Sequence, residues 1–372
     1  MHGKGHLRET TRLSMSRLYD ELLATLTDPA VRDLAWLLTS PGLLRAQQTS
    51  IRQTQWDTQQ MVEIRQWLCE LDREPAALHA ELLRLPQKRL GHYAEQLLAY
   101  FLVHGKVGRL IAANLAVRHG NRTLGECDFL LSAPDGALVH WELAVKCYLY
   151  AGARLANESV DEPGNTTRFA PYAELAQYVG PDLTDRFDRK LSHMVDHQLP
   201  LSARPEFAAQ IDAGPWRPEL FLKGWLFYPL AQPASESHQW VEPRHLRGWW
   251  VTPQAWREQR SMLAAQGWLV LSRRSWLAPR QAHTDASILD DAALDAFLAA
   301  QFAPMPVQVD DVDDDENDAT VLRNLTSPVL IAAMVRNGDG WQERSRGFVV
   351  EPQWVARAVS FAASEPGSQP RG

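Results

Sequence analysis

The sequence has few cysteines, no long apolar run and no excess of positive charge. Its three cysteines, Cys69, Cys127 and Cys147, show no Cys-x-x-Cys spacing, so we expect buried free thiols and neither a disulfide framework nor a zinc site. No run of 18 apolar residues occurs, which argues against a membrane span, and the first residues lack the apolar stretch of a secretory signal. We therefore expect a cytoplasmic protein that has no membrane partner.

The formal net charge of −7 comes from one segment. Residues 310–318 (DDVDDDEND) contain seven acidic residues and no basic one, so the rest of the chain is formally neutral. We interpret this run as a solvated loop, with cation binding or nucleic-acid mimicry as alternatives.

Basic residues gather in a different stretch. Residues 86–124 hold six of them against Glu95 alone: Lys88, Arg89, Lys106, Arg109, Arg118 and Arg122. A local positive surface would suit contact with phosphate groups, because the local field matters more than net charge. Scattered, solvated charge is the alternative.

Residues 89–150 show the clearest pattern of elements. Apolar residues from Leu90 to Phe101 recur at three- and four-residue steps, which predicts a helix with one buried face. Apolar runs at 110–117, 124–132 and 138–149, separated by turn residues, predict three strands, the last two forming an antiparallel hairpin.

Alternate residues of a strand share a face. We therefore expect Glu126 and Asp128 to point one way, and Cys127 and Phe129 the other. On the next strand the same rule places Glu142, Ala144, Lys146 and Tyr148 on one face. That run, WELAVKCYLY, is apolar enough to be covered on both sides.

Charged residues in such a strand need partners. Burying Glu142 and Lys146 is costly unless they meet each other or a cation. Glu95, on the preceding helix, could add a third carboxylate. Glu95, Asp128 and Glu142 with Lys146 would form an oxygen-rich pocket suited to Mg²⁺, which prefers carboxylates and water. A satisfied internal salt bridge is the alternative.

The order Gly91-x-x-x-Glu95, Gly125-Glu126-Cys127-Asp128 and a hydrophobic strand ending in Lys146 resembles the PD-(D/E)XK nuclease superfamily. The resemblance covers about residues 89–200 and is closest to an uncharacterised bacterial family placed in that superfamily. It implies an α+β or α/β fold whose core is a helix, a three-stranded meander, a second helix and a closing strand.

The resemblance also implies roles for individual residues. Asp128 would be the first metal ligand, Lys146 the catalytic lysine and Glu95 the helix carboxylate. The superfamily's second acid normally lies two residues before the lysine, where this chain has Ala144. Glu142 lies on the same strand face, roughly 7 Å further along at about 3.3 Å per residue, and is the expected replacement. The implied cofactor is Mg²⁺ or Mn²⁺, held by Asp128, Glu142 and Glu95.

Helical periodicity over residues 182–199 predicts the second helix. Because the superfamily often directs a polar or basic residue from this helix towards the metal, Lys190 is a further candidate catalytic residue. His193 and His197 lie four residues apart and could suggest zinc, but without a His-Glu-x-x-His context the pattern favours a solvated helix face.

The remaining chain suggests four regions: an N-terminal helical wrapper (1–88), the nuclease-like core (89–230), a C-terminal α+β region (231–363) and a flexible tail (364–372). Residues 219–229 read as the closing strand. Arg247–Gln254 (RGWWVTPQ) recurs as Arg346–Gln353 (RGFVVEPQ), which predicts two related strand-Pro-helix units.

Three functions remain open at this point. The first is a Mg²⁺-dependent nuclease that hydrolyses phosphodiester bonds in DNA or RNA, with Lys146 steadying charge in the transition state. The second is a nuclease fold that binds nucleic acid without cutting it, because Ala144 has removed a ligand. The third is a structural or partner-binding protein.

Overall fold

A computed structural model describes residues 19–45, 51–84, 89–152, 172–211, 213–231, 238–303 and 327–364. The acidic run 310–318 and the tail beyond Ser364 lie outside these ranges. Within them, no helix is both long and apolar enough to cross a membrane.

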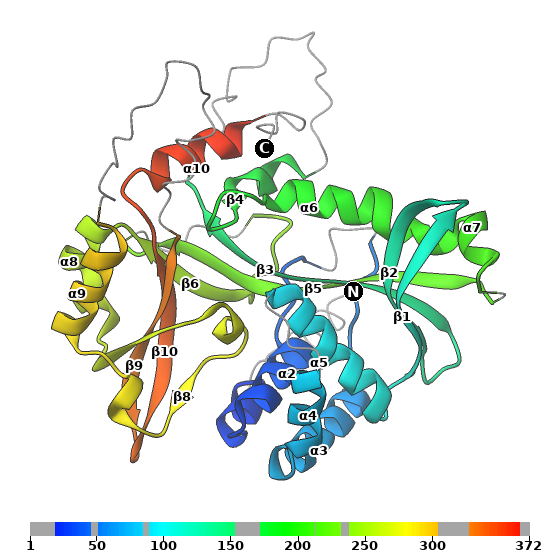
Figure 1. Ribbon diagram of the computed structural model, residues 1–372, viewed down its shortest axis with the longest axis horizontal. Helices are drawn as coiled ribbons and strands as arrows, with labels where there is room; N and C mark the ends of the chain where they lie inside the picture. The colour runs from blue at the N-terminus through cyan, green and yellow to red at the C-terminus, as the bar shows by residue number, and fades with distance from the viewer. Residues whose placement is uncertain are drawn as a thin grey trace, which may run out of the picture.

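One ten-stranded mixed sheet organises the molecule (Figure 1). The strand order is β1-β2-β3-β5-β6-β10-β9-β7, with β4 paired to β3 and β8 paired to β10. The strands are β1 (Arg109–His119), β2 (Arg122–Ser132), β3 (Leu138–Tyr150), β4 (Tyr178–Val179), β5 (Trp216–Pro229), β6 (Leu246–Val251), β7 (Gly267–Val270), β8 (Gln281–Ala282), β9 (Val329–Asn337) and β10 (Gly340–Val349).

Helices cover both faces of this sheet. Figure 1 shows α2 to α5 together below it, α6 and α10 above it, and α8 and α9 at the end that carries β9 and β10. Their bounds are α2 (Pro29–Thr39), α3 (Thr58–Arg73), α4 (Ala76–Arg84), α5 (Leu90–His104), α6 (Phe187–His193), α7 (Pro205–Ala208), α8 (Pro253–Gln259), α9 (Asp291–Gln301) and α10 (Trp354–Ala363).

The predicted order of helix, meander, helix and closing strand is present. α5 is followed by β1, β2 and β3, with β2 and β3 antiparallel as expected. β5 then lies parallel to β3, paired from Leu138 with Trp216 to Leu149 with Phe227. A parallel pair needs a long crossover connection. The connection from β3 to β5 contains α6, which lies above the sheet in Figure 1.

Both faces of β3 are covered, as its apolar sequence predicts. Trp141 and Leu143 pack in the cluster that includes α2 and α5, while Ala144 and Tyr148 pack in the cluster that includes Phe187 of α6. Glu142 is therefore fully buried in β3, whereas the Lys146 side chain stays partly exposed.

The predicted alternation on β2 is wrong at Asp128. Phe129 packs towards α5, whereas Cys127 packs with Leu130 in a cluster that includes Leu201. The neighbouring strand is irregular at the same place, since β1 pairs Ala113 with Phe129 and Leu115 with Cys127, and the intervening Asn114 has a left-handed φ of 53°. The departure from extended backbone on β1 thus lies opposite the change of face on β2.

The second helix begins later than its periodicity predicts. α6 starts at Phe187 and not at Asp182, because Leu183 has a left-handed φ of 55° that a right-handed helix cannot contain. After His193 the helix widens into a π-helical turn, Met194–Gln198.

The two copies of the internal repeat form the same pair of elements, a strand followed by a helix. β6 leads into α8 and β10 leads into α10, and the two strands are parallel neighbours. Their register pairs Trp249 with Gly347, one residue away from the alignment of the repeated sequences. A one-residue offset reverses the faces, so Trp249 and Phe348, which correspond in sequence, pack in different clusters.

Candidate active site

The predicted acidic residues meet where β2 and β3 separate. Regular pairing between these strands ends at Phe129 with Trp141, a register that brings Asp128 opposite Glu142. Beyond that point the Asp128 carboxylate accepts the backbone N–H of Leu143 at 2.8 Å. A side chain thus takes the place of a strand partner, which holds Asp128 at the split.

Glu142 is fully buried and is held from two sides. One carboxylate oxygen lies 2.7 Å from Nε2 of His140, and the other accepts the side-chain amide of Gln198 at 2.7 Å. Nδ1 of His140 lies 3.0 Å from the hydroxyl of Ser202. Each oxygen of an ionised carboxylate has two acceptor positions, so Glu142 keeps capacity for a further ligand.

Burial raises the affinity of both carboxyl groups for protons. Burial raises the pKa of Asp128 to about 8, and the charge of Glu142 adds to this effect. Burial also raises the pKa of Glu142 to about 8, against the opposing hydrogen bond from the Asp128 backbone and the charge of Lys190. Protons therefore remain on this pair near neutral pH unless a cation replaces them.

Lys146 lies on the same strand and pairs with a residue that the sequence did not single out. Its Nζ is 2.6 Å from Asp185, and the Tyr148 hydroxyl donates to the same carboxylate at 3.3 Å. Both charged side chains are about 30% exposed. Asp185 lies inside the range that the sequence predicts as a helix, 182–199. In the structure it precedes α6, and this position directs its side chain to Lys146.

Lys190 also reaches the site from α6. Its Nζ donates to Gln198 at 3.1 Å, and Gln198 in turn donates to Glu142. Burial and the charge of Lys146 lower the pKa of Lys190, while Asp128 acts in the opposite direction. The π-helical turn brings Gln198 into this bridging position.

Glu95 is a more distant neighbour. It lies half-buried on α5, and its charge contributes to the raised pKa of Asp128. Burial raises the pKa of Glu95 itself. Among the described residues, however, no hydrogen bond or ion pair joins it to Asp128 or Glu142. Glu142 and Lys190 are thus joined through Gln198, and Asp128, Lys146 and Glu95 act on this group through their charges.

Comparison with known proteins assigns the chain to a family. Residues 32–350 match the family described as a domain of unknown function, DUF1853. The chain belongs to the DUF1853 family. No curated protein and no solved structure matches it. The match includes all five predicted site residues of this DUF1853 chain.

A second group of potential metal ligands adjoins the carboxyl pair. Donor atoms of Cys127, His140 and Glu142 lie within 4.8 Å of one another, and all three residues are buried. A thiol and an imidazole favour softer metals than Mg²⁺. Burial, however, raises the pKa of Cys127 to about 12 and lowers that of His140 to about 4, so without a metal we expect a neutral thiol and a neutral ring. The sequence predicts Cys127 as a buried free thiol, and no pattern in it indicates a role for His140.

The His193 and His197 pair does not form such a group. Their rings lie 5.3 Å apart, and they share no third ligand within the part of the chain that the structure describes. The zinc alternative raised by their spacing therefore has no further support.

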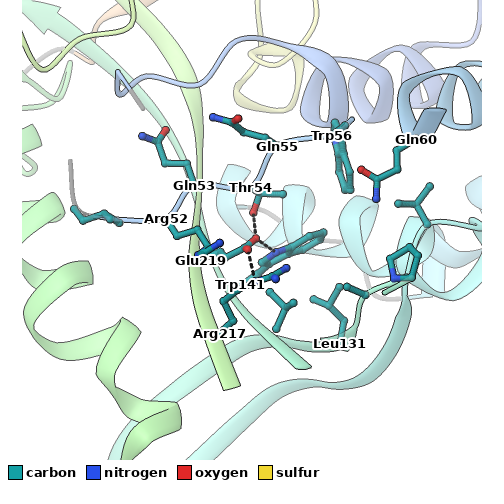
Figure 2. A pocket seen from close by; sticks show the side chains of 16 residues that line it. Arg52, Gln53, Thr54, Gln55, Trp56, Gln60, Leu131, Trp141, Arg217 and Glu219 are labelled. Atoms are coloured by element: carbon teal, nitrogen blue, oxygen red, sulfur yellow. Dashed lines mark hydrogen bonds and ion pairs between the residues drawn. The ribbon is translucent and has the colours of Figure 1, made fainter. Parts of the chain in front are cut away.

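The DUF1853 chain also has a cavity of about 610 Å³ that contains none of the five site residues. Figure 2 shows its polar wall, in which Glu219 accepts hydrogen bonds from Trp141 at 3.0 Å and Thr54 at 3.4 Å and pairs with Arg217 at 2.9 Å. Trp141 projects from the other face of β3 than Glu142, so this cavity and the carboxyl pair lie on different faces.

Proposed function

We propose that this protein is a Mg²⁺-dependent hydrolase of phosphodiester bonds in DNA or RNA, built on a core like that of the PD-(D/E)XK superfamily. The proposal rests chiefly on one observation: Asp128 faces Glu142 at the split between β2 and β3, with Lys190 and Lys146 beside them. Two acids and two amines on adjoining elements form a group that can attract a cation and a phosphate together.

The donor set fits a hard divalent cation. Asp128 and Glu142 are buried carboxyl groups whose pKa values are raised. The positive charge of Lys190 is therefore too small to offset the cost of burying both ionised carboxylates. Asp128 and Glu142, with Glu95 from α5, would hold Mg²⁺ or Mn²⁺. When bound, such a cation stabilises negative charge that develops on the phosphate.

The chain's own residues supply the rest. Glu142 takes the role of the acid that is missing at Ala144, and His140 and Gln198 hold it in orientation. Lys146, held by Asp185, presents a positive charge to the phosphate group. Lys190 is a positioning residue that acts on Glu142 through Gln198.

Nucleic acid can approach over the neighbouring edge of the sheet. β1 is an end strand of the sheet, and the exposed side chains of Lys106, Arg109, Arg118 and Arg122 lie on it or beside it. These charges would contact backbone phosphates in any sequence.

Cleavage assays with purified protein test this proposal. Single- and double-stranded DNA and RNA are incubated with Mg²⁺ or Mn²⁺, and we expect cutting that EDTA stops. Asp128→Asn should lower the rate at least about a hundredfold, since it removes a charge from the cation site. Asp196→Asn, which alters an exposed acid near the site, is the matched control and should cut normally. Equal cutting by the Asp128→Asn protein would rule out this site.

One observation favours a second candidate, a structural or partner-binding role. Both oxygens of Glu142 already have hydrogen-bond partners in the protein, and Lys146 is already paired with Asp185. A network so fully paired can serve stability alone. If neither cutting nor salt-dependent binding is found with any substrate, this role is the better account.

A further inference from the structure

A separate cavity of about 280 Å³ lies between the end of α2 and β5. Its wall includes residues 38–42, residues 53–56 and Leu220–Lys223. Residues 53–56 also border the cavity of Figure 2, where the Gln53 side chain points away from Glu219. None of the proposed hydrolase residues lines this second cavity.

Lys223 brings an amine to this cavity without an acidic partner. Its Nζ donates to the backbone carbonyl of Ser40 and lies 5.4 Å from the centre of the Phe221 ring. Among the described residues no carboxylate pairs with it. Glu242 also lines the cavity but pairs with Arg244 at 3.3 Å. Burial lowers the pKa of Lys223 to about 7.

Two further polar groups in the wall lack partners. The Ser40 hydroxyl and the Gln53 side-chain nitrogen are buried, and neither has a hydrogen-bond partner within the described part of the chain. Buried polar atoms are rarely left unpaired, because the loss of water is then uncompensated. Three residues that carry hydrogen-bond donors, Lys223, Ser40 and Gln53, thus line one small space.

The charge and the walls indicate what would fill that space. Lys223 and Arg244 against Glu242 leave one positive charge when the amine is protonated. Apolar side chains, including Leu38, Met61 and Phe221, form much of the remaining wall. The volume is below the range of about 300–1,000 Å³ that is usual for drug-sized ligands.

We propose that this cavity binds a small monocarboxylate, with its carboxylate at Lys223, Ser40 and Gln53 and a short apolar tail against the aliphatic wall. The anion supplies the negative charge that Lys223 lacks and accepts the unpaired hydrogen bonds. The site is independent of the proposed hydrolase activity.

Calorimetric titration with acetate, butyrate and hexanoate tests this site. Affinity should rise about fourfold for each added CH₂, since the tail leaves water. Near pH 8 the unliganded Lys223 amine is mostly neutral, so binding should take up protons, which is measured by repeating the titration in buffers of different ionisation enthalpy.

Two variants connect binding to these side chains. Lys223→Met should abolish both binding and proton uptake, whereas Lys106→Met, which removes an exposed lysine, should change neither. Ser40→Ala should weaken binding about threefold to tenfold, and it keeps the test decisive if Lys223→Met fails to fold. Absence of saturable binding of hexanoate, or equal binding by Ser40→Ala and wild type, overturns the proposal.

Discussion

At the residue scale, Asp128 and Glu142 place two acidic groups together where water is scarce. Each has a raised pKa, so the folded state holds protons that the unfolded chain releases. The raised pKa values lower the stability of the folded state at neutral pH, and shifts of this kind are common at functional sites. Two measurable consequences follow.

The stability of the protein without metal should fall as pH rises. Asp128 has an ordinary pKa of 3.8 and a folded pKa of about 8, so between these values the folded state binds more protons than the unfolded state. The free energy of unfolding then decreases through this window, by about 1.4 kcal/mol at most per pH unit for the proton on Asp128. Urea denaturation from pH 5 to 9 measures it. Asp128→Asn should flatten the curve, and Asp196→Asn should not.

Divalent cations should bind more tightly as protons leave. Because Mn²⁺ and protons compete for Asp128 and Glu142, the rise in Tm caused by Mn²⁺ should be larger at pH 8.5 than at pH 6. Thermal melts with and without Mn²⁺ give the comparison. An equal rise at both values, or the same rise in Glu142→Gln protein, would contradict cation binding by the pair.

Arg346 is a residue whose role is structural. It is fully buried and donates to both oxygens of Glu343, at 2.6 and 2.8 Å, and to the carbonyls of Trp276 and Ala278. Arg346→Met should lower the free energy of unfolding by about 3–5 kcal/mol, because Glu343 is left buried and unpaired. Denaturation in urea measures this loss. The double variant with Glu343→Leu should be more stable than Arg346→Met alone.

At the element scale, the Arg-Gly pairs pack in a similar way in both copies of the repeat. Gly248 lies under the ring of Phe227 and Gly347 lies under the ring of Trp249, each ring coming from the neighbouring strand. The preceding arginines, Arg247 and Arg346, stack on Tyr228 and Trp225. In each copy of the repeat, an aromatic ring of the neighbouring strand therefore packs directly on the backbone of a glycine, which has no side chain in the way.

Substitution of Gly347 tests this packing. A Cβ there would lie 2.0 Å from the Trp249 ring and 2.3 Å from the Trp249 carbonyl oxygen. Gly347→Ala should therefore cost about 3 kcal/mol or more, measured by urea denaturation. Gly91→Ala in α5, where a Cβ meets nothing within 4 Å, is the control and should be neutral or stabilising by up to about 1 kcal/mol.

At the scale of the whole molecule, the sheet continues across the regions suggested by the sequence. β5 pairs with β6 from Trp225 with Leu246 onward, and one apolar cluster contains both Trp141 and Phe348. Arg186 adds a further connection, since it pairs with Asp188 and donates to the carbonyls at the end of α10.

Thermal unfolding should therefore be one cooperative transition. Calorimetry should give equal calorimetric and van't Hoff enthalpies. Gly347→Ala, although remote from β2, should lower the midpoint of the entire transition. Two separated transitions would mean that the regions fold independently.

How much could be predicted depends on the range of the interactions involved. Periodicity located α5, β1 to β3 and β5, because helix and strand periods are written in consecutive residues. The same periods placed Glu142 and Lys146 on one face. They failed at Asp128, which lies opposite the left-handed Asn114 of β1, and at Leu183, whose left-handed φ delays the start of α6.

The partners within the site came from packing alone. Asp185 joins Lys146 across 39 residues, Gln198 joins Glu142 across 56, and His140 meets Ser202 across 62. Such meetings depend on the crossover that carries α6 over the parallel β3 and β5, and no local pattern encodes them. The sequence alone identifies the acidic residues. Their burial, and therefore their protonation, is decided only by the tertiary structure, because the residues that cover them come from distant parts of the chain.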